Sequence, residues 1–464
     1  MDEPIVGSIV GSGCYGKVYL TETAHGICAT KRMDPSSDGI TRDTARELHA
    51  LFLMGDLEWI VQVIEVHCDL TRSGNTLISI DFDHYTSDLY KFIKTVDLRQ
   101  RLECVNSIVL PMLHGLHALF QRGIIHRDIK PENILVQYQY DTRNNKLIGP
   151  ISCVIADFGI SRQLLCTHDQ DETKMTAMVY SPWYRPPELL EVLTNEKVYS
   201  YNADVWAMGA TIAEYYTGVP LFGVEKYTNQ KIAECIRTSL KPDGRCVDIT
   251  SFFKKHLRRH HLSTIPNRDI VKIETMLTYD RKLRPNINKL IDNQIIVSPS
   301  VPPLSRGRLQ IDNDSYQKLV MKIFDASIEY QLEPVTVINA IGILERYLTN
   351  CQPKDHQIIP LISVIAVSLS VLINEMKALT MTDYYEMANG EYEIHVIKQA
   401  QIIIASKIQY CFSTCEADVF MMTILDQPKP SSALRETYQG LFSNGQNPQL
   451  MSYYDLAAAV TKYS

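Results

Sequence analysis

One stretch of the chain decides its fold: Ile124-Ile125-His126-Arg127-Asp128-Ile129-Lys130-Pro131-Glu132-Asn133-Ile134-Leu135-Val136. Within it, a carboxylate, an ammonium group and an amide (Asp128, Lys130 and Asn133) lie between two apolar runs. A second carboxylate, Asp157, follows in Ala156-Asp157-Phe158-Gly159. Asp and Asn oxygens are ligands that Mg²⁺ accepts, and a lysine beside them can neutralise an anionic group. The pattern therefore indicates a site that holds a metal ion beside a charged substrate.

A glycine-rich segment lies upstream: Gly11-Ser12-Gly13-Cys14-Tyr15-Gly16-Lys17-Val18. Glycines let backbone N–H groups approach phosphates closely, although similar patterns also occur in ordinary hairpins. Lys31, in Ala29-Thr30-Lys31, follows this segment at a distance at which it looks like a lysine that contacts the α- and β-phosphates of a nucleotide. Glu47 lies on a helix predicted for residues 41–54 and is the natural ion-pair partner of Lys31. Taken alone, each of these two residues would be an ordinary solvated charge.

The four motifs occur together in one order, and phosphoryl transfer needs all their parts: held phosphates, a bound metal ion and an oriented hydroxyl. Asp128 is predicted to orient the hydroxyl of the substrate. Lys130 is predicted to neutralise the transferring phosphoryl group. Asn133 and Asp157 are predicted to hold Mg²⁺.

With these motifs, residues 1–297 resemble the catalytic domain of eukaryotic protein kinases. The resemblance implies an α+β, bilobal fold with a β-rich N-lobe and a helical C-lobe, and ATP and Mg²⁺ as cofactors. Three later segments also carry it: Trp183-Tyr184-Arg185-Pro186-Pro187-Glu188, Asp204-Val205-Trp206-Ala207-Met208-Gly209 and Arg284, which is expected to pair with Glu188. The combination of Lys130 and Ser181 favours serine/threonine over tyrosine as the acceptor.

The resemblance also implies the nucleotide site. Phe82 is expected at the back of the adenine pocket, and residues 83–85 are expected to form the hinge that binds adenine through backbone groups. The full set of expected nucleotide-binding residues is Val10, Gly11, Gly13, Tyr15, Gly16, Val18, Ala29, Lys31, Glu47, Phe82, Asp83, Tyr85, Leu135 and Asp157. Tyr15 also matches the inhibitory tyrosine of the family, but Cys14 replaces the neighbouring threonine.

Two segments are similar to cyclin-dependent kinases in particular: Thr44-Ala45-Arg46-Glu47-Leu48, like their cyclin-contacting helix, and Trp183-Tyr184-Arg185. This likeness implies proline-directed phosphorylation. Thr176 lies twelve residues before Glu188, where these kinases carry an activating threonine. A phosphate there needs cationic partners, which the resemblance assigns to Arg46, Arg127 and Arg162. The alternative is that Thr176 is merely a loop hydroxyl.

A linker rich in Pro and Ser, residues 298–312, precedes a second domain predicted for residues 313–427, and a tail follows over 428–464. The second domain resembles an all-α cyclin box, with the uncharged segment Ile358–Ile373 as its central buried helix rather than a membrane span. The match has departures: Leu372 and Gln401 stand where cyclins usually carry a lysine and a glutamate. Tyr316 replaces an arginine that would pair with the acid at Glu345.

Bulk properties limit the partners. The net charge is −7, and residues 313–464 hold 10 Lys/Arg against 16 Asp/Glu, which argues against nucleic acid or a membrane surface as a partner. The start Met1-Asp2-Glu3-Pro4 is unlike a secretory signal, so we expect a nuclear or cytoplasmic protein. Expected partners are protein substrates with Ser or Thr before Pro, the intramolecular cyclin-like domain and further regulatory proteins.

Three alternatives stay open at this point. The chain could be a pseudokinase scaffold, although every expected catalytic residue is present. The C-terminal helices could instead be an interaction module that recruits separate partners. The basic run Lys254-Lys255-His256-Leu257-Arg258-Arg259 could be a docking patch, a nuclear address or a solvated face. Residues 137–152, between the two acidic motifs, form a longer segment than usual.

Overall fold

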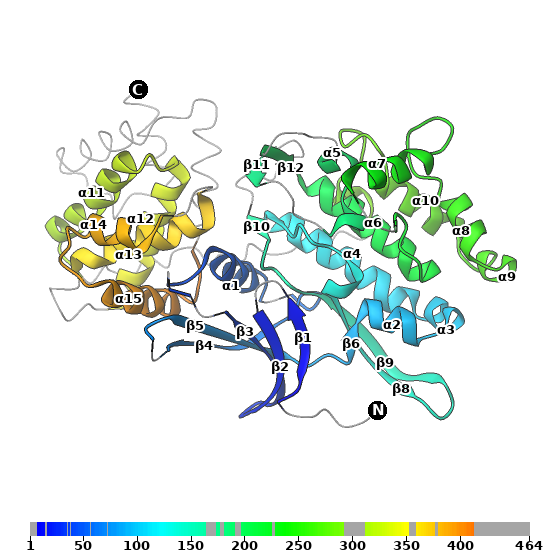
Figure 1. The fold of residues 1–464 in the computed structure, drawn as a ribbon, viewed down its shortest axis with the longest axis horizontal. Helices are drawn as coiled ribbons and strands as arrows, with labels where there is room; N and C mark the ends of the chain where they lie inside the picture. Colours follow the sequence, from blue (N-terminus) through cyan, green and yellow to red (C-terminus); the bar gives the residue numbers. More distant parts are fainter. Residues whose placement is uncertain are drawn as a thin grey trace.

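The computed structural model of the 464-residue chain consists of two lobes and a separate helical domain (Figure 1). The structure describes residues 7–13, 16–34, 36–37, 39–55, 57–71, 73–163, 173–176, 181–190, 196–224, 228–291, 311–351, 359–375 and 379–412.

The N-lobe is an antiparallel sheet of five strands with one helix, α1 (Arg42–Met54), against it. The strands run in the order β1-β2-β3-β5-β4. Their bounds are β1 (Ile9–Gly13), β2 (Gly16–Thr23), β3 (Gly26–Met33), β4 (Val63–Leu70) and β5 (Thr76–Asp83). The predicted helix over 41–54 is therefore present, and Thr41 caps it by accepting a hydrogen bond from the backbone N–H of Thr44.

The turn between β1 and β2 requires glycine at position 16, where β2 begins. Gly16 has a φ of +149°, and a Cβ there would lie 2.1 Å from the carbonyl oxygen of Arg32 on β3. Because β2 and β3 pair closely from Gly16 to Thr23, no side chain fits at position 16. This close pairing brings the glycine-rich segment directly above Lys31, which pairs with Val18.

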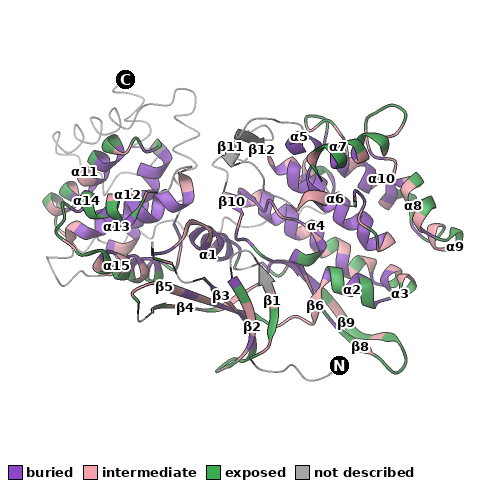
Figure 2. Cartoon of the chain, viewed as in Figure 1, coloured by how far each residue is buried: buried purple, intermediate pink, exposed green. Residues whose placement is uncertain are grey.

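The C-lobe is mainly helical and is built around α6 (Tyr201–Thr217), most of whose residues are buried (Figure 2). Its other described helices are α2 (Leu89–Thr95), α3 (Leu98–Glu103), α4 (Val105–Gln121), α5 (Pro187–Leu190), α7 (Asn229–Thr238), α8 (Ile249–His256), α9 (Arg259–Leu262) and α10 (Asn267–Met276), with 3₁₀ turns at Pro131–Asn133, Pro182–Tyr184 and Ile287–Lys289. Its described strands are β6 (Ser87–Asp88), β7 (Ile124–Ile125), β8 (Ile134–Asp141), β9 (Lys146–Ile155), β10 (Arg162–Gln163), β11 (Thr173–Thr176) and β12 (Glu196–Tyr199).

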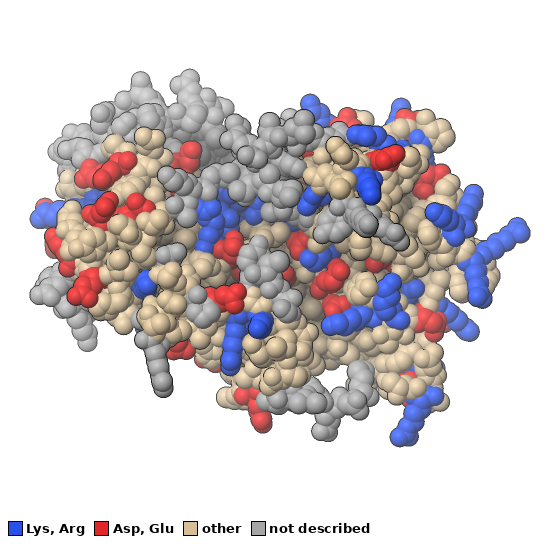
Figure 3. All heavy atoms as spheres, viewed as in Figure 1, with Lys and Arg blue, Asp and Glu red and all other residues tan. Residues whose placement is uncertain are grey.

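The structure also places two segments that the sequence analysis singled out in the C-lobe. The long segment 137–152 extends β8 and β9 into a hairpin, so this region is a sheet and not part of a helical pattern. The basic run crosses α8 and α9, and its four Lys and Arg side chains are exposed at the end of the C-lobe, where Figure 3 shows basic side chains projecting.

Within the described residues, the helical domain has four helices around a central one, α13 (Ile359–Asn374), in which residues 361–373 are all buried. The others are α11 (Asn313–Glu329), α12 (Pro334–Asn350), α14 (Met381–Met387) and α15 (Ile394–Lys407). Among the described residues, no helix is long and apolar enough to cross a membrane. Tyr316 donates a hydrogen bond to Glu345, so the tyrosine keeps a link between α11 and α12 at the position where the resemblance implied an arginine.

The helical domain docks on the N-lobe, with α13 beside α1 (Figure 1). The backbone N–H of Ile40 donates to Oε1 of Gln401 over 3.2 Å. The backbone N–H of Phe412 donates to Nδ1 of His49, a residue of α1 that is only 3% exposed. Burial of the α1 face by another domain fixes where this helix can lie relative to the sheet.

The expected pair between Glu188 and Arg284 is present and bidentate. Nη1 and Nη2 of Arg284 lie 2.8 and 3.1 Å from the two carboxylate oxygens of Glu188, and the arginine side chain is fully buried. The guanidinium also lies over the ring of Trp206 in α6. The pair thus ties the segment that ends in α5 to the core of the C-lobe.

We predict that Glu188→Ala destabilises the chain by about 3 kcal/mol, because it leaves the buried charge of Arg284 without its counter-ion. Differential scanning calorimetry measures this as a lower melting temperature for the C-lobe. Glu103→Ala is the matched control, since it removes a carboxylate from an exposed pair with Arg99 and is expected to change little. An equal effect of both substitutions would contradict the structural role of the buried pair.

Candidate active site

The loop of the deciding stretch is held in place by α6. The carboxylate of Asp204 accepts the backbone N–H groups of His126 and Arg127 over 2.7 and 3.0 Å. Arg127 has a φ of +68°, an unusual conformation for a residue with a side chain. The two hydrogen bonds that the buried carboxylate of Asp204 accepts stabilise this conformation, which directs the following Asp128 toward the cleft. The sequence analysis gave Asp204 only as part of a segment that carries the resemblance, and its bonds to the loop come from the structure.

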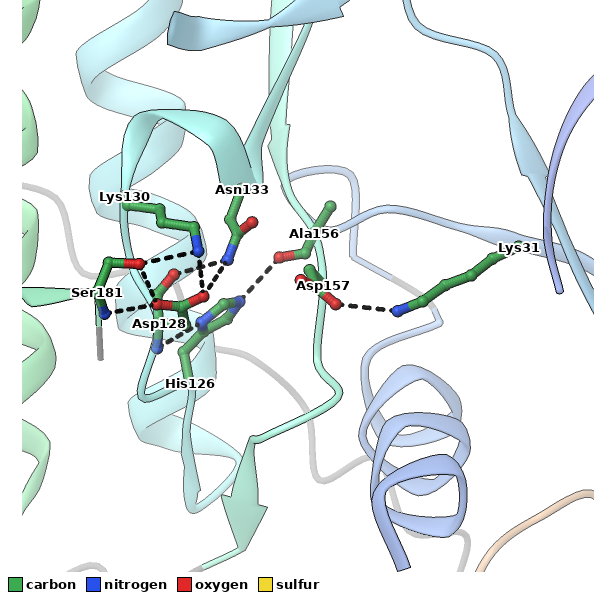
Figure 4. Close-up of polar contacts among 8 residues, drawn as sticks. All are labelled: Lys31, His126, Asp128, Lys130, Asn133, Ala156, Asp157 and Ser181. Carbon is green, nitrogen blue, oxygen red and sulfur yellow. Dashed lines mark hydrogen bonds and ion pairs between the residues drawn. The ribbon is translucent and has the colours of Figure 1, made fainter. Parts of the chain in front are cut away.

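Asp128 lies at the centre of a group of polar side chains (Figure 4). Nζ of Lys130 lies 2.5 Å from Oδ2 of Asp128 and 2.9 Å from Oγ of Ser181. Oδ1 of Asp128 accepts the backbone N–H of Ser181 over 3.0 Å. The amide of Asn133 donates to both the backbone carbonyl and Oδ2 of Asp128. The structure therefore brings the three predicted catalytic residues together, with Ser181 as a fourth member.

A second group of charges lies across the cleft. Nζ of Lys31 lies 2.6 Å from Oε1 of Glu47 on α1 and 2.9 Å from Oδ1 of Asp157. Burial opposes the charge of Lys31, but the two carboxylates outweigh it and raise its pKa above the ordinary value. Burial raises the pKa of Glu47, and Lys31 offsets part of that rise. For Asp157, burial is outweighed by Lys31, which lowers the pKa of this carboxyl.

These shifts keep Lys31 protonated and Asp157 ionised at neutral pH. The ion pair expected between Lys31 and Glu47 is present. The side chain of Asp157 is 44% exposed, which leaves its carboxylate accessible. The residue itself has a positive φ of +64°.

The two groups are neighbours because the backbone N–H of Ala156 donates to the carbonyl of Asn133 over 2.9 Å. His126 adds a further link, since its Nε2 bonds the carbonyl of Ala156 and its Nδ1 accepts the backbone N–H of Asp128. Sequence reasoning did not single out this histidine. Its position inside the deciding stretch is the only signal that pointed to it.

The expected nucleotide residues lie on facing elements. Ala29 on β3 pairs with Phe82 on β5, and Phe82 is 8% exposed. Val18 on β2 pairs with Gly11, and Leu135 on β8 lies on the opposite lobe. Val10 on β1 is 38% exposed, and Gly13 pairs with Gly16. Asp83 and Tyr85 lie at the start of the connection between the two lobes. The expected contact at Tyr15, like the departure at Cys14, lies outside the described residues.

The residues present fit a hard divalent cation and a nucleotide. Asn133 uses its amide nitrogen on Asp128, which leaves its carbonyl oxygen for a cation, and Asp157 keeps its carboxylate exposed. Carbonyl and carboxylate oxygens are the donors that Mg²⁺ prefers. Lys31 supplies a buried positive charge, with a raised pKa, for an anionic phosphate.

The three arginines expected to meet a phosphorylated Thr176 cluster between α1, the catalytic loop and β10. Burial lowers the pKa of Arg46 well below its ordinary value, and three nearby guanidinium groups lower it further, those of Arg162, Arg42 and Arg127. Burial, with Arg127 and Arg42, lowers the pKa of Arg162 to about 10. Like charges gathered at buried positions make this cluster suited to an anion.

Two of these arginines also contact the helical domain. Nη2 of Arg46 donates to the carbonyl of Ile373 over 3.5 Å, and Nη2 of Arg162 donates to the carbonyl of Asn374 over 2.7 Å. Both acceptors are at the C-terminal end of α13, where helix carbonyls lack intrahelical partners. The backbone of Thr176 lies in β11 and pairs with Glu196 in β12. The described part of the structure does not include the Thr176 side chain.

Comparison with known proteins places this site in a family. The protein kinase domain model matches residues 5–296 of the chain. The chain belongs to the protein kinase family. A second match, to the cyclin N-terminal domain, covers residues 287–413, so this kinase is of the cyclin-dependent type and is fused to a cyclin box.

Individual relatives agree with this classification. Cyclin-dependent kinase B2-1 of Oryza sativa subsp. japonica is 30% identical over 230 residues, which are 48% of this kinase and 65% of the rice protein. A probable cell division protein kinase of Encephalitozoon cuniculi (strain GB-M1) is 31% identical over 233 residues, 50% of this chain and 77% of the relative. The serine/threonine-protein kinase MAK of Mus musculus is 31% identical over 294 residues, 61% of this chain and 43% of the relative.

Ser181 offers a direct test of how this kinase positions Asp128. We predict that Ser181→Ala lowers kcat by about tenfold and leaves the KM for ATP unchanged, because Lys130 loses one of its two partners near Asp128 while Lys31 is untouched. Steady-state kinetics with a peptide substrate measure both constants. Ser181→Thr keeps a hydroxyl at the same position and is expected to retain most of the rate. A rise in the KM for ATP as large as the fall in kcat would contradict this role.

Proposed function

We propose that this chain is a serine/threonine protein kinase of the cyclin-dependent type that uses MgATP and is activated in cis by its own cyclin box. One observation carries the proposal. The Lys31–Glu47 bond of 2.6 Å is formed while α1, which carries Glu47, is packed against α13 of the cyclin box. The domain boundaries 1–297, 298–312, 313–427 and 428–464 are part of this proposal.

The catalytic step follows from the polar groups around Asp128. Its carboxylate accepts the proton of a serine or threonine hydroxyl and orients the oxygen for in-line attack. Lys130, 2.5 Å from Asp128, neutralises charge on the phosphoryl group during transfer. When bound, MgATP supplies the phosphoryl group and the cation that balances its charge. Asn133 and Asp157 would hold that cation, and Lys31 would hold the α- and β-phosphates.

Cis activation has a physical basis in the placement of α1. The isolated helix would carry a buried face with no partner, and Glu47 reaches Lys31 only when α1 lies close to the sheet. Covalent linkage gives the cyclin box an effective concentration in roughly the millimolar range, so fewer specific contacts are needed to hold α1. This allows the departures at Leu372 and Gln401.

Phosphorylation of Thr176 is the proposed second step of activation. A phosphate carries nearly two negative charges at neutral pH and would be neutralised by the cluster of Arg46, Arg127 and Arg162. Since two of these arginines also bond α13, the phosphate and the cyclin box would stabilise the same arrangement. Proline after the acceptor residue, further regulatory partners and a nuclear or cytoplasmic location belong to the proposal on the strength of the family resemblance.

We predict that the purified full-length chain phosphorylates a peptide with Ser-Pro and that Asp128→Asn lowers the rate by about 10²–10⁴-fold, because the amide cannot accept the hydroxyl proton. Transfer of radiolabelled phosphate from ATP measures the rate, with a Ser-Ala peptide as the control for proline preference. Equal rates on both peptides would contradict proline direction. A wild-type chain that carries phosphate on Thr176 and still phosphorylates the peptide no faster than Asp128→Asn would favour the scaffold alternative.

We predict that a fragment of residues 1–297 is less active than the full chain by about tenfold or more, within the usual range for coupled sites. The reason is that α1 loses the surface against which it packs. The same peptide assay measures this, and circular dichroism establishes that the fragment is folded. A folded fragment as active as the full chain would contradict activation in cis and favour the interaction-module alternative.

A further inference from the structure

The basic run on α8 and α9 lies in a segment without acidic residues. Residues 249–268 contain five Lys or Arg and three His but no Asp or Glu, although the whole chain has a net charge of −7. A solvated surface usually carries charges of both signs. Four of these cations, Lys254, Lys255, Arg258 and Arg259, are exposed at the end of the C-lobe (Figure 3). The segment is therefore a local concentration of positive charge, apart from the catalytic groups around Asp128.

A cavity of about 670 Å³ lies beside this segment. It is formed by α3, the start of α4, the end of α6, α9 and the start of α10. Four basic side chains line it: Arg99 from α3, His260 and His261 from α9, and Arg268 from α10. Because Arg99 is far from the other three in the sequence, only the folded chain brings these groups to one cavity.

Apolar side chains line the same cavity. Ile265 is 6% exposed, and Leu102 and Val105 are half-buried against the core of the C-lobe. Apolar walls lower the local dielectric, which strengthens the attraction between an anion and a nearby guanidinium group. A concave site with a few charged groups and apolar walls can hold part of a ligand, which a flat solvated face cannot do.

Two carboxylates also line the cavity, and both are weakly paired. Oε1 of Glu103 lies 3.4 Å from Nε of Arg99. Oδ1 of Asp269 lies 3.7 Å from Nε of Arg268, while Oδ2 of Asp269 accepts the hydroxyl of Tyr216 over 3.3 Å. Both arginine side chains are 84% exposed, and exposed pairs of this kind contribute little to stability. A phosphate, with nearly two negative charges and several acceptor oxygens, can therefore take over the two guanidinium groups.

We propose that this cavity docks a phosphorylated, acidic segment of a protein substrate, with the phosphate held by Arg99 and Arg268 and further acidic residues along the basic run. Arginine clusters recognise phosphorylated motifs through charge-assisted, bidentate hydrogen bonds. The inference rests on the proposed function in one respect, because a kinase of this type makes phosphoserine and phosphothreonine itself. A long nucleic acid or an anionic membrane would meet the rest of a chain with a net charge of −7, whereas a short peptide contacts only the basic segment.

Fluorescence anisotropy with the full-length chain measures this binding and needs no catalysis. The probe is a labelled acidic peptide with one phosphoserine, and its control is the same peptide with unmodified serine. The phosphorylated peptide is expected to bind about tenfold more tightly or better, because only the phosphate carries the charge that the two arginines hold. The cavity variant, Arg99→Gln combined with Arg268→Gln, is expected to remove this difference.

Arg143→Gln combined with Arg245→Gln is the matched control. It removes two exposed guanidinium groups that do not line the cavity, so it changes the net charge equally and is expected to leave binding unchanged. An unchanged melting temperature establishes that the cavity variant is folded. Arg258→Gln combined with Arg259→Gln tests the basic run separately and is expected to weaken binding of the phosphorylated peptide by about threefold.

Three outcomes would overturn the inference. The first is equal binding of the two peptides by the wild-type chain. The second is phosphopeptide binding that survives in the cavity variant, which would place the phosphate at another site, such as the cluster of Arg46, Arg127 and Arg162. The third is displacement of the probe by phosphatidylserine vesicles or single-stranded RNA more readily than by unlabelled phosphopeptide, which would assign the cavity to that ligand.

Failure of the proposed function gives a different result. A chain that binds the phosphopeptide through the cavity but phosphorylates no peptide would keep the docking site on a scaffold. Conversely, an active chain that binds the two peptides equally would keep the kinase function and reject the docking site.

Discussion

The position of α1 is the constraint on which the rest of the structure depends. Lys31 is nearly buried, and its charge is stable there only because Glu47 and Asp157 lie within 2.9 Å. Glu47 is carried by α1. A short connection before Arg42 joins this helix to β3, the strand that holds Lys31. Whatever fixes α1 therefore fixes the charge arrangement of the cleft. In this chain the helical domain covers the outer face of α1 and supplies that restraint.

The same helix connects three regions that would otherwise be independent. Glu47 faces the cleft, Arg46 faces the carbonyl of Ile373 and His49 accepts the backbone N–H of Phe412. Nearby positions on a helix point in different directions, so this one rigid element contacts the nucleotide site, the arginine cluster and the cyclin box together. This geometry gives a physical reason why docking and catalysis would be coupled. A shift of α1 large enough to break one contact would disturb the others.

Much of the local arrangement was predictable. The helix over 41–54, the Lys31–Glu47 bond and the pair between Glu188 and Arg284 follow from motifs with strict spacing, because each partner sits at a fixed place in a known order. The buried central helix of the second domain followed from an uncharged apolar segment, which excludes an exposed position. The bonds of Asp204 to the catalytic loop and the role of His126 were missed. Asp204 lies far from the catalytic loop in sequence, and His126 lies beside residues that the motif already identifies. No periodic pattern in the sequence predicts the contacts of either residue.

The sequence by itself determined the two domains, the order of the motifs and the chemical identity of the cleft, because these depend on residue type and spacing. It also determined that Leu372 and Gln401 depart from a charged pair, but not what replaces that pair. Only the tertiary structure decided that Gln401 joins Ile40 to Ser368 and that the segment 137–152 pairs as a hairpin. The physical reason is that such contacts depend on how surfaces distant in sequence meet, which is settled by packing and backbone geometry and not by local propensity.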